Sequence, residues 1–314
     1  MINLRYHIVS LMAVFLALAL GVVMGSTVID RAIVDGLENQ VNSVGARATR
    51  TANENRALRD QLNLMQNFAQ EARDQLVEGH LRGVPVLVIV VQGIDRKPVE
   101  ALREALATAE AIPAGTLLLT NKLRLDNDTD IRSLGTTLSL NSTSADAVRG
   151  QFVSRVAGVL DGSVSDSNVI PALAAAGFLG YEPPASTPTT AASLGLTSFP
   201  VGGLRMVLVS GAGAEVSDDG LARPLSEALS QGAPNRSRLV VAESGVDTPG
   251  GRAVFVGPLR ADGSLGPRLS TVDNLETPVG QAAVVLALED LARPTTGHYG
   301  VGPGADRLLP AVEQ

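Results

Sequence analysis

An unbroken apolar run, VLVIVV, occupies residues Val86–Val91 of this 314-residue chain. Its length and its β-branched side chains are typical of a strand that is buried on both faces of a parallel sheet. Gly83-Val84-Pro85 precedes the run and ends the helix before it, and Pro98 stands where the first residue of a helix is favoured. The run therefore predicts a β-α-β unit, with its helix ending near Ala111 and its second strand at Gly115–Thr120.

A second unit of the same order follows about 120 residues later, so we expect either an internal duplication or one doubly wound sheet. It consists of a strand at Leu204–Ser210, a helix at about Pro224–Ser230 and a strand at Arg238–Glu243. Further helices are expected at Asp128–Leu138, Ala145–Leu160 and Pro278–Leu291, a strand at Val254–Val256 and a loop at Pro183–Pro188. These elements predict a Rossmann-like α/β domain over residues 80–293, followed by a Gly/Pro-rich tail over residues 294–314.

The N-terminal part of the chain carries a hydrophobic segment. Residues Ile8–Met24 contain no charge, and about 20 helical residues cross the hydrocarbon layer of a membrane. Arg5 precedes the segment, so the positive-inside rule predicts a cytoplasmic tip and anchor over residues 1–28, with everything after them exported. A cleaved signal peptide is the alternative, but its small-x-small candidate, Ala17-Leu18-Ala19, lies inside the apolar run. We therefore expect a single-pass protein of the cell membrane.

A heptad repeat follows the anchor. With Val34 at position a, positions a and d keep their 3/4 spacing as far as Leu76, which predicts a coiled-coil stalk over residues 29–79. The expected dimer core contains Val41, Val44, Asn55, Leu58, Leu62 and Met65.

Asn55 indicates how two stalks would pair. A buried Asn at position a pairs well only with its own copy, which favours a parallel, in-register homodimer. Glu54 at position g and Arg59 at the next position e are then placed to form an interchain ion pair. In the alternative arrangement, the helix folds back against its own α/β domain and Asn55 finds its partner there.

Composition excludes several classes of function. The net charge of −7 argues against a nucleic-acid-binding protein. The absence of cysteine rules out disulfides, Cys zinc sites, Fe–S clusters and thiol nucleophiles. His7, His80 and His298 are far apart in the sequence, so no local metal cage or Ser-His-Asp triad is visible. We predict no enzymatic activity, no catalytic or metal-binding residue and no cofactor.

Two short motifs resemble ligand sites. Gly211-Ala212-Gly213 is placed as in a dinucleotide fingerprint, but the third glycine is missing, and Glu243 follows about 30 residues on instead of about 20. A plain β-to-α turn is the favoured interpretation. Asp126–Asp130 resembles the start of a calcium loop, but Ile131 occupies the required glycine position. Capping of the following helix by these carboxylates is the favoured interpretation.

Several segments, most of them near the two ends of the chain, carry a resemblance to a known family. They are Met1–Leu11, the exit Gly21…Met24-Gly25-Ser26, Ser270-Thr271-Val272-Asp273-Asn274, Gly297-His298-Tyr299-Gly300 and Gly302-Pro303-Gly304-Ala305-Asp306. Together they resemble the actinobacterial copper transport protein B (MctB-like) family of envelope proteins, over nearly the whole chain. The resemblance implies a role in copper efflux and homeostasis, with copper as the ion handled, but it transfers no copper-binding residue.

The family is described as an outer-membrane channel, whereas one apolar helix cannot enclose a pore and the alternating strands of a membrane barrel are absent from this sequence. Any copper path would therefore need an oligomer. The same architecture also fits a second function, a non-enzymatic dimeric scaffold in cell division or cell separation. Such a scaffold would couple a cytoplasmic partner at Met1–His7 to envelope enzymes that act on peptidoglycan.

Overall fold

The structure is a computed structural model. It describes residues 4–141, 144–166, 168–184, 204–231, 238–245, 254–293 and 295–311, without the side chains of residues 26–35. The chain divides into two compact units, residues 1–66 and residues 67–314.

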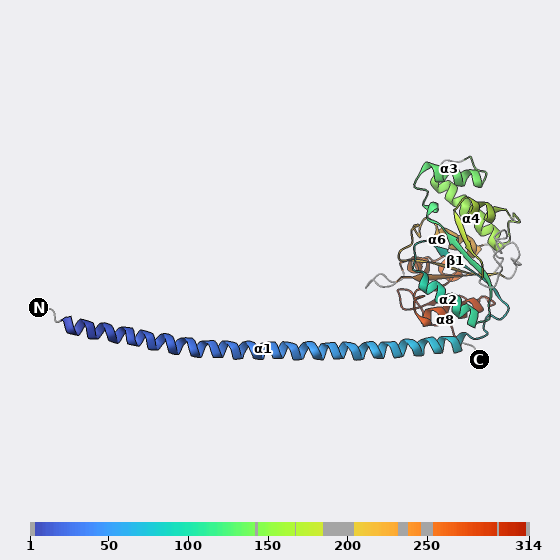
Figure 1. Ribbon diagram of the computed structural model, residues 1–314. Coiled ribbons are helices and arrows are strands. Elements are labelled where there is room, and N and C mark those ends of the chain that lie inside the picture. Colours follow the sequence, from blue (N-terminus) through green and yellow to red (C-terminus); the bar gives the residue numbers. More distant parts are fainter. Residues whose placement is uncertain are drawn as a thin grey trace. The chain divides into compact units, whose positions relative to one another are not determined.

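One helix, α1, runs for 74 residues from Leu4 to Val77 (Figure 1). Among the described residues, its segment Leu4–Gly25 is the one that is long and apolar enough to cross a membrane. This segment contains the predicted anchor, Ile8–Met24, and the helix continues without a break into the heptad repeat. Gly36 and Gly45 do not interrupt it, although each glycine disfavours a helix interior by about 1 kcal/mol relative to alanine.

The second unit is built on a seven-stranded sheet with the order β3-β2-β1-β4-β5-β6-β7. Its strands are β1 Pro85–Val91, β2 Ile112–Leu119, β3 Leu179–Glu182, β4 Arg205–Gly211, β5 Leu239–Ser244, β6 Ser270–Val272 and β7 His298–Tyr299. Strand β3 is antiparallel to β2, and the other pairings are parallel. Both predicted β-α-β units belong to this one sheet and meet where β1 pairs with β4.

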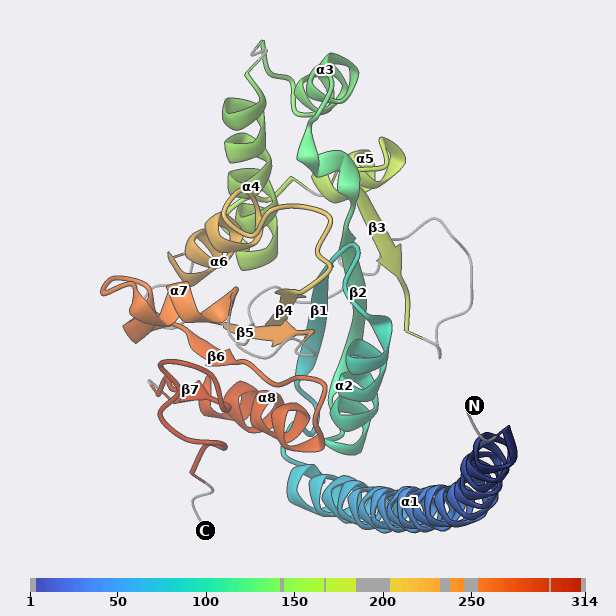
Figure 2. The same ribbon diagram turned by 90° about the vertical axis from the view of Figure 1, so that its left-hand side faces the viewer.

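Helices cover both faces of the sheet (Figure 2). They are α2 Arg96–Thr108, α3 Asp128–Thr137, α4 Ala145–Asp161, α5 Val169–Ala175, α6 Ala222–Gln231, α7 Val256–Ala261 and α8 Pro278–Asp290, with short 3₁₀ helices at Asn121–Arg124 and Gly266–Arg268. Helices α2 and α8 pack on one face, and α4, α6 and α7 pack on the other. Successive side chains of a strand point to opposite faces, so the VLVIVV run of β1 supplies apolar residues to both cores.

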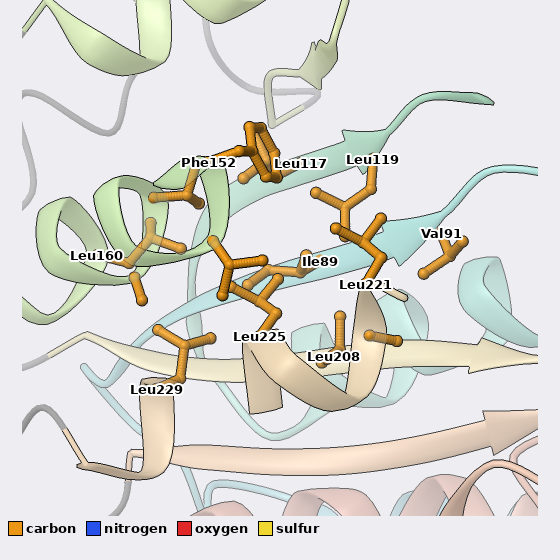
Figure 3. Packing of buried hydrophobic residues seen from close by; sticks show 14 of the residues in the cluster. Ile89, Val91, Leu117, Leu119, Phe152, Leu160, Leu208, Leu221, Leu225 and Leu229 are labelled. Carbon is orange, nitrogen blue, oxygen red and sulfur yellow. The ribbon is translucent and has the colours of Figure 1, made fainter. Parts of the chain in front are cut away.

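The larger core lies between the sheet and helices α4 and α6. Phe152 and Leu160 of α4 and Leu225 of α6 meet Ile89 and Leu117 of the sheet there (Figure 3). All five side chains are at most 2% exposed. Helices α4 and α6 each bury apolar residues against the strands, which stabilises both helices in the fold.

Most predicted elements are present. Four of the five predicted strands correspond to β1, β2, β4 and β5, and the predicted helices correspond to α2, α3, α4, α6 and α8. The strand predicted at Val254–Val256 is wrong, because Val254 and Phe255 form a turn and α7 begins at Val256. Most of the predicted loop Pro183–Pro188 lies outside the described residues.

Among the described residues, three strands and two α-helices, α5 and α7, were not predicted. Strands β3, β6 and β7 contain only four, three and two residues, and β6 and β7 read STV and HY. Such segments have no apolar periodicity of their own, and they become strands because a neighbouring strand offers its unpaired backbone groups. Strand β7 lies in the predicted Gly/Pro-rich tail, so at least this part of the tail belongs to the sheet.

Candidate functional site

The predicted dimer-core residues all lie on α1. Val41, Val44, Leu58, Leu62 and Met65 are 57–66% exposed within the single chain. Asn55, Glu54 and Arg59 are exposed as well. A row of large, exposed apolar side chains is the usual mark of an association surface. The parallel dimer and the Glu54–Arg59 ion pair stay predictions.

The loops that follow β1 and β4 are in direct backbone contact. Gly93 has a φ of +102°, and a Cβ atom on it would lie 2.2 Å from the carbonyl oxygen of Gly213. The backbone N–H of Glu215 donates to the carbonyl oxygen of Gln92 at 2.8 Å. Ligands of open α/β sheets bind in the crevice at this point, but here the backbones of the two turns contact each other. The glycines of Gly211-Ala212-Gly213 therefore serve a plain β-to-α turn, as we expected.

Glu243 at the end of β5 holds the start of α7. Its side chain accepts hydrogen bonds from the backbone N–H groups of Val254 at 2.8 Å, Phe255 at 3.0 Å and Val256 at 2.9 Å. These bonds pull the segment away from a strand ladder, which is why the strand prediction failed here. Burial raises the pKa of Glu243, the three hydrogen bonds lower it and the nearby charge of Asp218 raises it.

Asp218 is a second acid at this edge of the sheet, and it is half-buried. It accepts a hydrogen bond from the hydroxyl of Ser210 at 2.5 Å. Burial raises the pKa of Asp218, and the hydrogen bond from Ser210 lowers it. Both acids therefore bind a proton more tightly in the folded chain than in the unfolded chain.

Exchanging both acids for amides, Asp218→Asn with Glu243→Gln, is expected to change how stability depends on pH. A raised pKa contributes stability that is complete below the unfolded pKa and is lost as pH rises through the folded pKa. The ordinary values are 3.8 for Asp218 and 4.5 for Glu243. The difference in unfolding free energy, wild type minus double variant, should therefore decrease as the pH rises above these ordinary pKa values. It should become constant once the pH exceeds the folded-state pKa values. Urea unfolding of the full chain at a series of pH values measures this difference, and a pH-independent difference would contradict the expectation.

The acidic segment Asp126–Asp130 caps α3. The side-chain oxygen of Asn127 accepts from the backbone N–H of Asp130 at 2.9 Å, and Asp128 and Asp130 lie in the first helical turn. Negative charge is favourable there because of the helix dipole. The segment does cap α3, but the expectation that a carboxylate is the capping group is wrong, because the amide of Asn127 takes that role.

A buried ion pair joins α7 to the end of β6. The side chains of Arg260 and Asp273 are 2% and 0% exposed, and Nη1 of Arg260 lies 2.7 Å from Oδ2 of Asp273. Arg260 also donates to the hydroxyl of Thr271 and to the carbonyl oxygen of Tyr299, each at 2.8 Å. Every charge in this pair is therefore matched by hydrogen-bonding groups, which a buried ion pair requires.

The same ion pair holds the C-terminal segment. Asp273 accepts from the backbone N–H groups of Val301 and Gly302, each at 2.8 Å. Nδ1 of His298 lies 3.0 Å from the hydroxyl oxygen of Thr271. Burial lowers the pKa of His298, and the charge of Arg260 lowers it further. The segments 270–274 and 297–306, which carry part of the family resemblance, are thus one structural unit around Arg260.

Each of the three histidines has its own surroundings. His7 is exposed on α1, and Nδ1 of His80 lies 2.7 Å from Oε2 of Glu289 on α8. His298 contacts Thr271. Within the described ranges, no group of three His, Asp or Glu side chains is close enough to hold a metal ion.

Comparison with known proteins gives the family. The family described as "Copper transport outer membrane protein, MctB" matches residues 1–310. The chain is 28% identical to "Copper transporter MctB" of Mycobacterium tuberculosis (strain ATCC 25618 / H37Rv), over 97% of this chain and 98% of that protein. It is also 28% identical to the protein of that name from Mycobacterium leprae (strain TN), over 98% of this chain and 99% of the relative.

These relatives are named as transporters, which is consistent with the prediction that the chain is not an enzyme. They favour the copper role over the division scaffold. With the apolar segment of α1, the match supports a membrane-anchored protein. The chain belongs to the MctB family of copper transport outer membrane proteins.

Proposed function

We propose that this protein is a membrane-anchored component of copper transport that keeps intracellular copper low. The observation that carries the proposal is the family match over residues 1–310, with relatives named copper transporters. The apolar segment Leu4–Gly25 supports insertion into a membrane, and Arg5 favours a cytoplasmic N-terminus. The corresponding parts are the tip and anchor at 1–28, the stalk at 29–79, the exported domain at 80–293 and the tail at 294–314.

A single apolar helix encloses no water-filled path, so transport by this protein needs more than one copy or a partner. The heptad surface of α1 supports self-association, because five of its six core residues named above are apolar and exposed in the single chain. Asn55 at position a favours a parallel, in-register coiled coil, in which Glu54 and Arg59 are neighbours across the two chains. We therefore take the functional unit to be a parallel homodimer.

The exported domain then has a Rossmann-like fold that does not bind a nucleotide. The order β3-β2-β1-β4-β5-β6 supports this description, although β3 is antiparallel to β2. The contact between Gly93 and Gly213 and the use of Glu243 as a cap for α7 oppose dinucleotide binding.

Deleting the gene in the source bacterium is expected to raise cell copper, measured by elemental mass spectrometry, and the wild-type gene is expected to restore it. A Leu58→Asp, Leu62→Asp variant should fail to restore it, because two carboxylates enter the proposed dimer core. Asp60→Asn, at the outward position f of the same heptad, is the matched control and should restore it. Unchanged copper in the deletion strain, together with chains of unseparated cells, would overturn the transport proposal in favour of the scaffold.

The stalk dimer has a direct test because the chain contains no cysteine. An Asn55→Cys variant is expected to form an interchain disulfide on mild oxidation in membranes, since position a faces its own copy in a parallel dimer. Asp60→Cys should remain largely monomeric on non-reducing gels, because position f faces away from the partner. Equal cross-linking of the two variants, or none at position 55, would contradict a parallel, in-register dimer.

A further inference from the structure

A hollow lies between α2 and the part of the sheet formed by β1, β2 and β3. It consists of two adjoining cavities of about 460 and 270 Å³. Glu100, Arg103 and Thr116 line both cavities. Sites for small molecules are typically about 300–1,000 Å³, mostly apolar, with a few polar groups. The larger cavity fits this description, since apolar side chains of β1, β2 and α2 form most of its wall.

A β-bulge shapes the floor of the hollow. Val86 pairs with Pro113 and Val88 pairs with Thr116, so β2 advances three residues where β1 advances two. Gly115 lies inside the bulge with a φ of +89°, a conformation that an L side chain rarely adopts. Bulges change the direction in which side chains of a strand point. Here Thr116 lines the hollow, whereas Leu117 joins the core on the opposite face.

The hydroxyl of Thr116 is buried and has no partner within the described part of the chain. Thr116 is 4% exposed, and its Oγ1 makes no hydrogen bond. A buried polar group without a partner costs about 1–3 kcal/mol, so such a group needs an explanation. Thr271 provides a contrast, since its hydroxyl contacts both Arg260 and His298.

The two arginines at the rim of the hollow, Arg96 and Arg103, share the carboxylate of Glu182. Glu182, which faces Thr116 across the β2–β3 pair, binds the guanidinium of Arg96 and lies 3.5 Å from that of Arg103. The carboxylate of Glu100 adds a further negative charge at the rim. An anionic head group would therefore find both arginines already paired with Glu182, and it would be repelled by the carboxylates. A charged group of either sign in the apolar cavity would lose its hydration, which is unfavourable.

We propose that this hollow, the α2 groove, binds an uncharged, lipid-like amphiphile whose polar group hydrogen-bonds to the hydroxyl of Thr116. The apolar chain of the ligand lies in the larger cavity, against Val86, Val88 and Leu106. The hydroxyl of Thr116 donates or accepts, so a neutral hydroxyl or carbonyl group on the ligand satisfies it. This binding activity is independent of the copper role.

Photolabelling of the full chain in lipid nanodiscs tests the proposal. The probes are a long-chain primary alcohol that carries a diazirine and a terminal alkyne, and the matching hydrocarbon without the hydroxyl. Mass spectrometry is expected to find the alcohol on peptides from β1, β2 and α2. Thr116→Val should lower labelling by the alcohol by about two- to tenfold, the loss of one hydrogen bond. It should leave labelling by the hydrocarbon unchanged.

Two further variants separate the groove from non-specific labelling. Ala107→Trp fills the larger cavity from α2 and should abolish labelling there with both probes. Ala147→Trp places the same side chain at an exposed position of α4 on the other face of the sheet and should change nothing. The proposal is overturned if the wild type carries no label at the α2 groove, or if Ala107→Trp labels as strongly as Ala147→Trp. It is also overturned if Thr116→Val leaves labelling by the alcohol unchanged. If this variant is less stable as well, the hydroxyl of Thr116 hydrogen-bonds to a structural water and not to a ligand.

Discussion

Replacing Arg260 by methionine is expected to destabilise the α/β domain by about 3–5 kcal/mol, the cost of leaving a buried charge without its partner. Methionine is close to arginine in length and fills much of the same space. The carboxylate of Asp273 remains, 0% exposed and without its cation. The change also removes the hydrogen bonds from the guanidinium to Thr271 and Tyr299, so β6, β7 and the C-terminal segment lose a common anchor.

Urea unfolding of the full chain, followed by tyrosine fluorescence, measures this effect. The chain has three tyrosines and no tryptophan, and Tyr299, which is 1% exposed, lies inside the affected region. The matched control is Arg82→Met, which breaks an ion pair with Glu110 whose side chains are 74% and 45% exposed. Solvent screens that pair, so its loss should leave the unfolding midpoint almost unchanged. A similar small shift for both variants would show that the buried pair is not an anchor.

Phe152→Ala is expected to cost about 3–5 kcal/mol, the usual range when a phenylalanine is removed from a core. Phe152 is 0% exposed on α4, where it packs against the sheet near Leu117 (Figure 3). Truncation removes the buried ring and leaves a cavity between α4 and the sheet, which neighbouring side chains fill only in part.

The control for this prediction is Phe68→Ala. Phe68 is 72% exposed on α1, so the same atoms are removed from solvent instead of from a core. The unfolding midpoint of the α/β domain should stay within error of the wild type. If Phe152→Ala costs no more than Phe68→Ala, the packing between α4 and the sheet does not stabilise the domain as described.

Local patterns in the sequence predicted those elements in which buried apolar residues form an unbroken run or recur at a regular spacing. The VLVIVV run predicts β1 because a strand covered on both faces needs apolar residues at every position. The apolar segment of α1 was visible because a membrane span needs about 20 apolar residues in a row. The start of α3 was visible as well, although the group that caps it is the amide of Asn127, three residues before Asp130, and not a carboxylate.

Other features have no local pattern to find. Arg260 and Asp273 are 13 residues apart and meet only because α7 and β6 pack together. Strand β7, with the sequence HY, pairs with β6, and nothing in two residues predicts such a pairing. From the sequence, Glu243 was noted only as the wrongly spaced acidic residue of an incomplete dinucleotide fingerprint. Its three partners lie 11 to 13 residues away, on a segment that we expected to be a strand.

In strand β2, Thr116 combines a feature that the sequence predicted with one that only the tertiary structure set. The sequence predicted a strand at this position, but the face on which each residue lies depends on the pairing with β1. The bulge at Gly115 moves Thr116 into the α2 groove, and it follows from the register between two strands rather than from either strand alone.

The sequence by itself therefore determined the apolar anchor, the heptad surface and the strands and helices with a clear period, because each depends on neighbours along the chain. Only the tertiary structure decided the order of the sheet, the short strands at its edges, the ion pair around Arg260 and the unpartnered hydroxyl of Thr116. These features depend on groups that are distant in the sequence and close in space, and their energies arise only when folding removes water from between them.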